Sequence, residues 1–200
     1  MFVNREKRTE RSIDMEFLDI TKVSEGRFIT RYDVRYKTSS GSIKNYEMIS
    51  RDKDITSFEQ LREHKAQAVV LIMHSRDGEK ILINKEFRMA VGDYAYNFPA
   101  GLIDEGETSE QAAKRELWEE TGLELVEVKD VMPISYSGVG LTNEQSKVIV
   151  GVAEGEFSPS TSDEEEIEAS WYSKEEMKEL LKSEQFAART QAYCWLWANS

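Results

Sequence analysis

Cysteine is nearly absent from this chain of 200 residues. Cys194 is the single one, which excludes an internal disulfide and suits a reducing compartment such as the cytoplasm. Histidine is also scarce, since only His64 and His74 are present, so neither a zinc site nor a histidine-based triad is expected. We therefore expect a cytoplasmic protein whose chemistry depends on other side chains.

Basic side chains are in deficit. The chain has 26 Lys and Arg against 38 Asp and Glu, and its formal net charge is −12 at pH 7. A surface for DNA or RNA needs clustered Lys and Arg to neutralise phosphates, so we expect no nucleic-acid partner. The net charge does not exclude a small anionic substrate, because metal ions can screen a site locally.

Long apolar runs are missing as well. No stretch approaches the length of a membrane span, and the N-terminal segment Met1–Arg8 lacks the apolar core of a signal peptide, so we expect no membrane association. The hydrophobic fraction of 40% is ordinary for a globular protein. A chain of this length can bury a core in one domain with an appendage or in two small domains.

The N-terminal part is predicted to form a small antiparallel sheet. Side chains of Phe28–Lys37 alternate with a period of two, which marks a half-buried strand. A turn at Thr38–Gly41 leads to a second strand at Ile43–Arg51, and Met15–Val23 supplies a third. A sheet of about 40 residues is too small to be stable alone. It should therefore pack on the rest of the chain or on another subunit.

We place the domain boundary so that residues 1–57 form this sheet and residues 58–200 form a larger domain. Apolar runs bounded by turn residues predict strands in the larger domain, and longer amphipathic segments predict helices. The strands are expected at Ala68–Met73, Lys80–Phe87, Tyr94–Phe98, Val126–Pro133, Val148–Phe157 and Ala169–Tyr172, and the helices at residues 108–121, Lys174–Leu181 and Glu184–Ala198. This mixture predicts an α/β (α+β) fold.

Gly101–Leu123 is the most informative segment of the chain. Thr108 and Gln111 form a capping box, in which the threonine begins a helix and the glutamine reaches back to its amide. Gly122 suits the left-handed position that follows a helix. The helix should therefore run from Thr108 to about Thr121.

Three glutamates share one face of this helix, because Glu116, Glu119 and Glu120 are spaced i, i+3, i+4. No Lys or Arg lies three or four residues away on that face to neutralise all three. A divalent cation is the natural partner, and hard carboxylate oxygens favour Mg²⁺ or Mn²⁺ over zinc. For a glutamate triplet taken alone, a solvated acidic face is the alternative interpretation.

The wider spacing resembles a known signature. Gly101, five residues, Glu107, seven residues and then Arg115–Leu123 fill every fixed position of the Nudix hydrolase signature, G-x5-E-x7-R-E-U-x-E-E-x-G-U, with U aliphatic. The resemblance implies a Nudix α/β/α sandwich with a mixed sheet, preceded here by the small N-terminal antiparallel sheet. It also implies that Glu107 and Arg115 pair and, with Gly101, support the site structurally.

The implied activity is metal-dependent hydrolysis of a pyrophosphate bond. Two or more Mg²⁺ ions, or Mn²⁺ as the alternative, would cancel the charge of the diphosphate and lower the pKa of bound water. Glu116 and Glu120 are the first candidates for metal ligands, and Glu119 is the next. By resemblance, the main-chain carbonyl of Ala100 completes one metal's ligand set.

Segments outside the signature resemble the ADP-ribose pyrophosphatase branch of the family. These are the Pro-Ala-Gly entry within Phe98–Asp104, the end of the hairpin at Tyr46–Arg51, the segment Glu86–Arg88 and the loop Ser137–Glu144. For ADP-ribose, the products would be AMP and ribose 5-phosphate. An N-terminal sheet is typical of this branch and often forms a domain-swapped dimer, so we expect a homodimer.

The same resemblance suggests residues for the substrate and the general base. Arg51 and Arg88 would hold phosphate or ribose, since guanidinium groups suit phosphate oxygens, although a surface ion pair is the simpler interpretation of each. The branch often takes its base from a late acidic loop, here Asp163–Glu166, with Glu164 and Glu165 as our candidates beside Glu119 and Glu120 of the helix. Glu144 is the alternative base and could instead bind metal or substrate.

Three departures from the branch fall near the pocket. Asn97 stands where a glutamate is usual, and Ala90 and Gly138 stand where prolines are common. Hydrolysis is still expected despite these departures. The substrate could instead be a nucleotide sugar, NADH or a dinucleoside polyphosphate. A domain that senses nucleotide metabolites without hydrolysing them is the other alternative.

Overall fold

A computed structural model describes residues 15–162 and 164–200 and divides the chain into two compact units. The first unit extends to Glu63 and also includes Ser137–Glu144; the second consists of His64–Tyr136 and Gln145–Ser200. The short helix α1 (Phe58–Leu61) lies in the first unit, where Phe58 stacks on Phe17 with ring centroids 4.9 Å apart. No helix in the described ranges is long and apolar enough to span a membrane.

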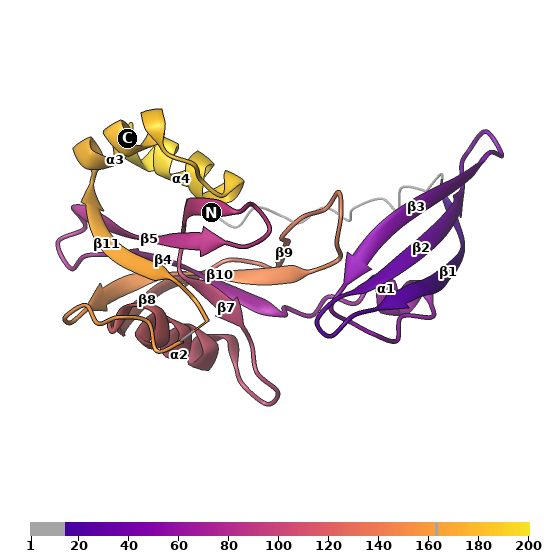
Figure 1. The fold of residues 1–200 in the computed structure, drawn as a ribbon, viewed down its shortest axis with the longest axis horizontal. Coiled ribbons are helices and arrows are strands. Elements are labelled where there is room, and N and C mark those ends of the chain that lie inside the picture. The colour runs from indigo at the N-terminus through magenta and orange to yellow at the C-terminus, as the bar shows by residue number, and fades with distance from the viewer. Residues whose placement is uncertain (1–14, 163) are drawn as a thin grey trace, which may run out of the picture. The chain divides into compact units, whose positions relative to one another are not determined.

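The first unit is built on a three-stranded antiparallel sheet of order β1-β2-β3 (Figure 1). Its strands are β1 (Glu16–Glu25), β2 (Thr30–Lys37) and β3 (Ile43–Ser50), close to the expected ranges. The period of two places Tyr32 and Val34 in a small core with Met48 and Ile55.

The second unit contains an eight-stranded mixed sheet. Its main order is β11-β5-β4-β10-β8, with β6 paired to β5, β7 to β4 and β9 to β10. The strands β4 and β10 pair in parallel, and the other pairs are antiparallel. The bounds are β4 Ala68–His74, β5 Lys80–Arg88, β6 Asp93–Asn97, β7 Ala100–Leu102, β8 Glu124–Val131, β9 Ser135–Tyr136, β10 Gln145–Glu154 and β11 Ile167–Ser173.

Helices cover both faces of this sheet (Figure 1). The helix α2 (Ser109–Thr121) packs on one face through Ala112, Ala113 and Leu117. On the other face, α3 (Lys174–Ser183) and α4 (Ala188–Ala198) enclose a second core. The expected α/β/α sandwich with a mixed sheet is therefore confirmed.

Several expected boundaries were wrong by a few residues, among them both ends of β8 and both ends of β10, and two of the differences have a clear structural cause. The last helix begins at Ala188 and not at Glu184, because the preceding segment bonds to strand β6: Tyr96 N–H donates to Gln185 O at 2.8 Å, and Phe186 stacks on the Tyr96 ring. The strand β10 begins at Gln145 and not at Val148, because its first two residues pair with the short strand β9, which the sequence pattern did not indicate.

Candidate active site

The helix α2 begins and ends where its capping residues predict. The Thr108 hydroxyl accepts a hydrogen bond from the backbone N–H of Gln111, and the Gln111 side-chain oxygen accepts one from the backbone N–H of Thr108. The capping box thus satisfies two N–H groups at the start of the helix. Gly122 adopts a left-handed conformation with φ 76°, and its N–H donates to Trp118 O. This framework fixes the positions of the three glutamates of the helix.

These three glutamates differ in exposure. Glu120 is buried, with 6% of its surface exposed; Glu116 and Glu119 are half-buried, with 14% and 39% of their side chains exposed. Because Leu117 points into the core, the helix holds the neighbouring carboxylates at the edge of that core. The triplet is therefore not a uniformly solvated acidic face.

Arg115 connects the loop to the helix and also reaches two of the three glutamates. Its Nη2 donates to Glu107 Oε2 at 2.8 Å and to the Leu102 carbonyl at 2.9 Å. Its Nη1 donates to Glu116 Oε1 at 2.8 Å and to Glu119 Oε2 at 3.1 Å. The hydrogen bond from Arg115 holds the pKa of Glu107 below its usual range. Arg115 thus supports the loop and offsets part of the charge on the helix.

Gly101 leaves the space that Glu116 occupies. A Cβ atom built on Gly101 would overlap the Glu116 carboxylate, and the conflict involves all three atoms of that group. A side chain at this position would force the carboxylate to move. The glycine of the signature is therefore required here by close approach, since its φ is not among the left-handed values.

Glu120 lies among acidic groups. Burial raises its pKa well above the usual value, and the charges of Glu116, Glu86 and Glu165 act in the same direction. Asn84 Nδ2 donates to Glu120 Oε2 at 2.8 Å, and a hydrogen bond from the Ala100 main chain favours the charged form. Three other carboxylates therefore disfavour the charged form of buried Glu120.

Glu116 shows the same pattern more weakly. Burial raises its pKa, the Arg115 hydrogen bond lowers it, and the charges of Glu119 and Glu165 raise it again. The charge of Glu165 is therefore among the causes that raise the pKa values of both Glu116 and Glu120.

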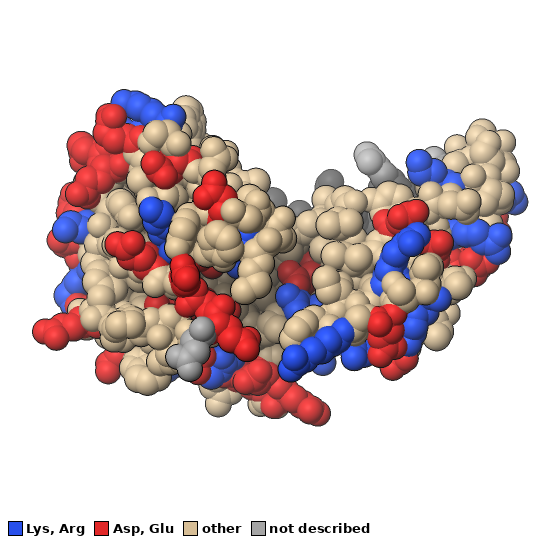
Figure 2. Space-filling view, in the orientation of Figure 1, with Lys and Arg blue, Asp and Glu red and all other residues tan. Residues whose placement is uncertain are grey.

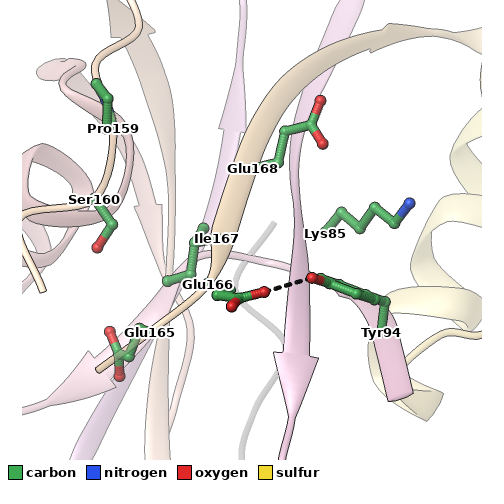
Figure 3. A pocket seen from close by; sticks show the side chains of 8 residues that line it. All are labelled: Lys85, Tyr94, Pro159, Ser160, Glu165, Glu166, Ile167 and Glu168. Carbon is green, nitrogen blue, oxygen red and sulfur yellow. Dashed lines mark hydrogen bonds between the residues drawn. The ribbon is translucent and has the colours of Figure 1, made fainter. Parts of the chain in front are cut away.

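The acidic loop Asp163–Glu166 is bound to strands β5 and β6 through its last residue, Glu166. Tyr94 donates through its hydroxyl to Glu166 Oε2 at 2.5 Å (Figure 3). Phe87 N–H donates to the Glu166 carbonyl. Glu165 and Glu166 line a cavity of about 530 Å³ with Lys85 and Tyr94. Glu164 is exposed, and its amide bonds to Ser162. Asp163 lies outside the described residues.

The sequence profile of the NUDIX domain matches residues 64–195. This chain belongs to the Nudix family. Among similar proteins are the ADP-sugar pyrophosphatase of Mus musculus, 28% identical over 134 residues, and the ADP-ribose pyrophosphatase of Saccharomyces cerevisiae, 28% identical over 131 residues. The matched regions cover 67% and 64% of this chain but only 59% and 54% of those relatives.

A solved structure described as an ADP compounds hydrolase has the same fold as this Nudix protein. It superposes with a TM-score of 0.68 at 21% identity and covers 92% of this chain and 91% of its own. At this identity the likeness concerns the fold alone.

The residues of this site fit a divalent cation. Buried Glu120 is surrounded by acids whose charges a cation would offset, and Gly101 makes room for Glu116. The buried oxygen Asn84 Oδ1 has no hydrogen-bond partner among the described residues. As the side chains of the described ranges lie, no group of three or more His, Cys, Asp or Glu could hold a metal ion. Arg115 donates to oxygens of both Glu116 and Glu119, so a cation would have to replace it there.

The residues expected to bind substrate fall into both units. In the first unit, Arg51 Nε donates to Glu144 Oε2 at 2.7 Å, and Ile49 N–H bonds to the Leu141 carbonyl, so the loop Ser137–Glu144 is held against β3. In the second unit, Arg88 Nη1 lies 3.4 Å from Glu86 Oε2. Both arginines therefore form the ion pairs that the simpler interpretation anticipates.

Three polar residues at this site were not selected from the sequence. They are Asn84, Glu86 and Thr190, all of which are buried. A usable signal existed for the first two, because Asn84 and Glu86 stand two apart near the end of the apolar strand β5 and so share one face. Thr190 carried no such signal, since its role depends on how α4 packs against β6.

Proposed function

We propose that this Nudix protein hydrolyses the pyrophosphate bond of a nucleoside diphosphate linked to another moiety, with ADP-ribose converted to AMP and ribose 5-phosphate as the first choice. The observation that carries the proposal is the complete set of signature glutamates around buried Glu120. The names of the mouse and yeast relatives support the choice of an ADP-linked substrate.

The cofactor of the proposed reaction is Mg²⁺, with Mn²⁺ as the alternative, in two or more ions. Glu116, Glu119 and Glu120 would hold it, together with the Ala100 carbonyl. Such ions supply charge neutralisation at the diphosphate and a more acidic bound water. Arg115 holds the signature loop to the helix through its hydrogen bond to Glu107. It also donates to Glu116 and Glu119, so these two glutamates would be shared between Arg115 and the ions.

Glu165 is our candidate for the general base. Its charge is among the causes that raise the pKa values of Glu116 and Glu120, and its side chain lines the cavity beside Glu166, which supports this choice. Glu164 is the alternative within the loop. Glu144, which pairs with Arg51, is the alternative outside it. A base must come within hydrogen-bond reach of the proton that it takes, which is the criterion for choosing among them.

Arg51, Arg88 and Glu144 are proposed to bind the substrate. Each arginine is partly exposed and paired with a single carboxylate, which leaves further guanidinium N–H groups available for phosphate oxygens. Their positions in segments that resemble the ADP-ribose pyrophosphatase branch support this role.

A substrate panel tests the proposed function directly. ADP-ribose, a nucleotide sugar, NADH and a dinucleoside polyphosphate are each incubated with Mg²⁺ or with EDTA, and phosphate-containing products are measured. We expect fastest cleavage of ADP-ribose and loss of cleavage with EDTA. Faster cleavage of another compound would keep the reaction and replace the substrate. Tight binding without cleavage of any compound would contradict hydrolysis and favour a sensor.

We propose in addition that the protein is a homodimer formed through the N-terminal sheet. Phe28 and Ile29, which precede β2, and Ile43, which begins β3, are 63%, 48% and 54% exposed, and contact with a second copy would cover such apolar side chains. We expect light scattering at micromolar concentration to give twice the mass of the chain. A monomeric mass under these conditions would contradict the dimer.

Nucleic acid and membranes are not proposed as partners. Acidic side chains are spread over the visible face of the second unit (Figure 2), in line with the net charge of −12. A surface of this sign repels polyphosphate backbones and anionic lipids. We propose a cytoplasmic location, which suits the single buried Cys194 and which cell fractionation would test.

A further inference from the structure

Glu86 lies beside the signature glutamates although it is outside the signature. It stands two residues from Asn84 on β5, and residues two apart on a strand share a face. Asn84 on that face contacts Glu120. Glu86 is only 9% exposed, and its charge is one of the causes that raise the pKa of Glu120. The strand therefore places Glu86 on the face of β5 from which Asn84 bonds to the buried carboxylate of the helix.

Asn97 holds the Glu86 carboxylate from the neighbouring strand. Asn97 Nδ2 donates to Glu86 Oε1 at 3.1 Å. In the β5–β6 pair, Asn84 is opposite Asn97 and Glu86 is opposite Ala95, so Asn97 is the diagonal neighbour of Glu86. Diagonal neighbours on one face of a sheet are within reach of side chains of this length.

The orientation of the Asn97 amide is fixed from behind. Thr190 Oγ1 on α4 donates to Asn97 Oδ1 at 2.8 Å. Thr190 Oγ1 also accepts a hydrogen bond from Phe98 N–H at 3.4 Å. An asparagine amide has an acceptor at one end and donors at the other. Because Asn97 Oδ1 accepts the hydrogen bond from the Thr190 hydroxyl, the NH₂ group of Asn97 must face Glu86. Thr190 is fully buried, so water does not compete for this bond.

We propose that Asn97 is a positioning residue that, with Thr190 behind it, holds Glu86 as an additional acidic oxygen donor for the divalent cation. The proposal rests on the proposed function. It also accounts for the departure at Asn97: the acidic group expected on β6 is absent there, and Glu86 supplies one from β5 across the same strand pair.

A rival explanation involves Arg88. Its Nη1 lies 3.4 Å from Glu86 Oε2, so Glu86 could serve only to orient this arginine. The two explanations differ in what they predict for metal binding without substrate. If Glu86 acted only through Arg88, loss of the arginine would change metal binding as much as loss of the glutamate.

Titration with Mn²⁺ alone, followed by the electron paramagnetic resonance signal of the free ion, separates these possibilities. We expect Asn97→Leu to weaken Mn²⁺ binding about tenfold, the lower end of what loss of an outer partner of a metal ligand costs. Glu86→Gln, which removes the proposed donor itself, should weaken it at least as much. Thr190→Val, which keeps shape and removes only the hydroxyl, should weaken it in the same direction. Arg88→Ala should leave Mn²⁺ binding unchanged and raise KM.

An exchange of the two groups provides the sharpest test. The double variant Glu86→Gln with Asn97→Glu restores one acid and one amide in hydrogen-bond reach, with their strands exchanged. We expect it to recover most of the Mn²⁺ affinity lost in Glu86→Gln. A purely structural role for Asn97 predicts no recovery. Thermal unfolding shows whether each variant is folded. If Asn97→Leu does not fold, the Mn²⁺ affinity of Thr190→Val tests the positioning role in its place.

The proposal is overturned if Glu86→Gln binds Mn²⁺ within twofold of the wild type, if Thr190→Val does so, or if the double variant binds no better than Glu86→Gln. It is also overturned if Arg88→Ala loses as much affinity as Glu86→Gln. Failure of the proposed function looks different, because the wild type itself would then neither bind Mn²⁺ nor cleave any compound of the panel.

Discussion

Replacement of Glu120 by Gln is expected to lower the metal-dependent rate of hydrolysis by about three orders of magnitude or more. Loss of a metal's charge stabilisation is worth several kcal/mol, and about 1.4 kcal/mol corresponds to a tenfold change in rate. Glutamine keeps the size of the side chain and can still accept from Asn84. Steady-state kinetics with Mg²⁺ measure the effect, and turnover equal to the wild type would refute the assigned site.

The same substitution should have the opposite effect on stability in EDTA. The raised pKa of Glu120 means that the folded protein binds more protons than the unfolded chain between the ordinary carboxyl pKa and the raised one. Wild-type stability contributed by this group is therefore full at low pH and is lost as pH rises through that window. Glutamine does not titrate, so metal-free Glu120→Gln should melt at a higher temperature than the wild type at pH 7.5 and show no such gain at pH 4.

Addition of Mn²⁺ should reverse the order of the two melting temperatures at pH 7.5, because only the wild type gains binding free energy from the ion. Glu110→Gln is the matched control, since Glu110 is an exposed acid in the first turn of the same helix. It should change neither the rate nor the response to metal. Thermal unfolding followed by circular dichroism, with and without EDTA, measures all of these differences.

Gly101→Ala is expected to weaken Mn²⁺ binding more than tenfold and to lower the hydrolysis rate about 100-fold. The added methyl group would overlap the Glu116 carboxylate, and that carboxylate must leave its place between Gly101 and Arg115. Helix α2 does not need to unfold, because a glutamate side chain can turn toward solvent. The loss should therefore fall on metal binding and rate, with a smaller loss of stability.

Gly140→Ala is the control for this glycine. A Cβ at Gly140 meets nothing within 4 Å, and its backbone is not left-handed. We expect its Mn²⁺ affinity and thermal stability to equal those of the wild type. Wild-type Mn²⁺ affinity in Gly101→Ala would show that Glu116 is not a ligand or that the loop adjusts without cost.

The local structure of helix α2 was predictable from the sequence. Thr108, Gln111 and Gly122 decide where the helix begins and ends, and these are short-range hydrogen-bonding and backbone effects. The spacing of Glu116, Glu119 and Glu120 then places them on one face through helix geometry alone. The alternation of the N-terminal strands and the apolar runs of the second unit likewise predicted the class of fold, because side-chain period follows directly from backbone geometry.

Boundaries that depend on distant partners were not predictable in this way. The segment before α4 reads as helical, yet its backbone bonds to Tyr96 of β6, a contact between residues about 90 positions apart. The short strands β7 and β9 form by pairing with β4 and β10, which are distant from them in the sequence or follow them. Long-range pairing of this kind overrides local propensity, which is a weak preference by comparison.

The sequence by itself determined the family, the helix and its three glutamates, since these follow from residue type and spacing within 23 consecutive residues, Gly101–Leu123. Only the tertiary structure decided that Glu120 is buried, that Arg115 reaches Glu116 and Glu119 as well as Glu107, and that Glu86 joins the acidic group through Asn97 and Thr190. Burial and charge proximity arise from packing among β5, β6, α2 and α4, which no single segment of the chain encodes.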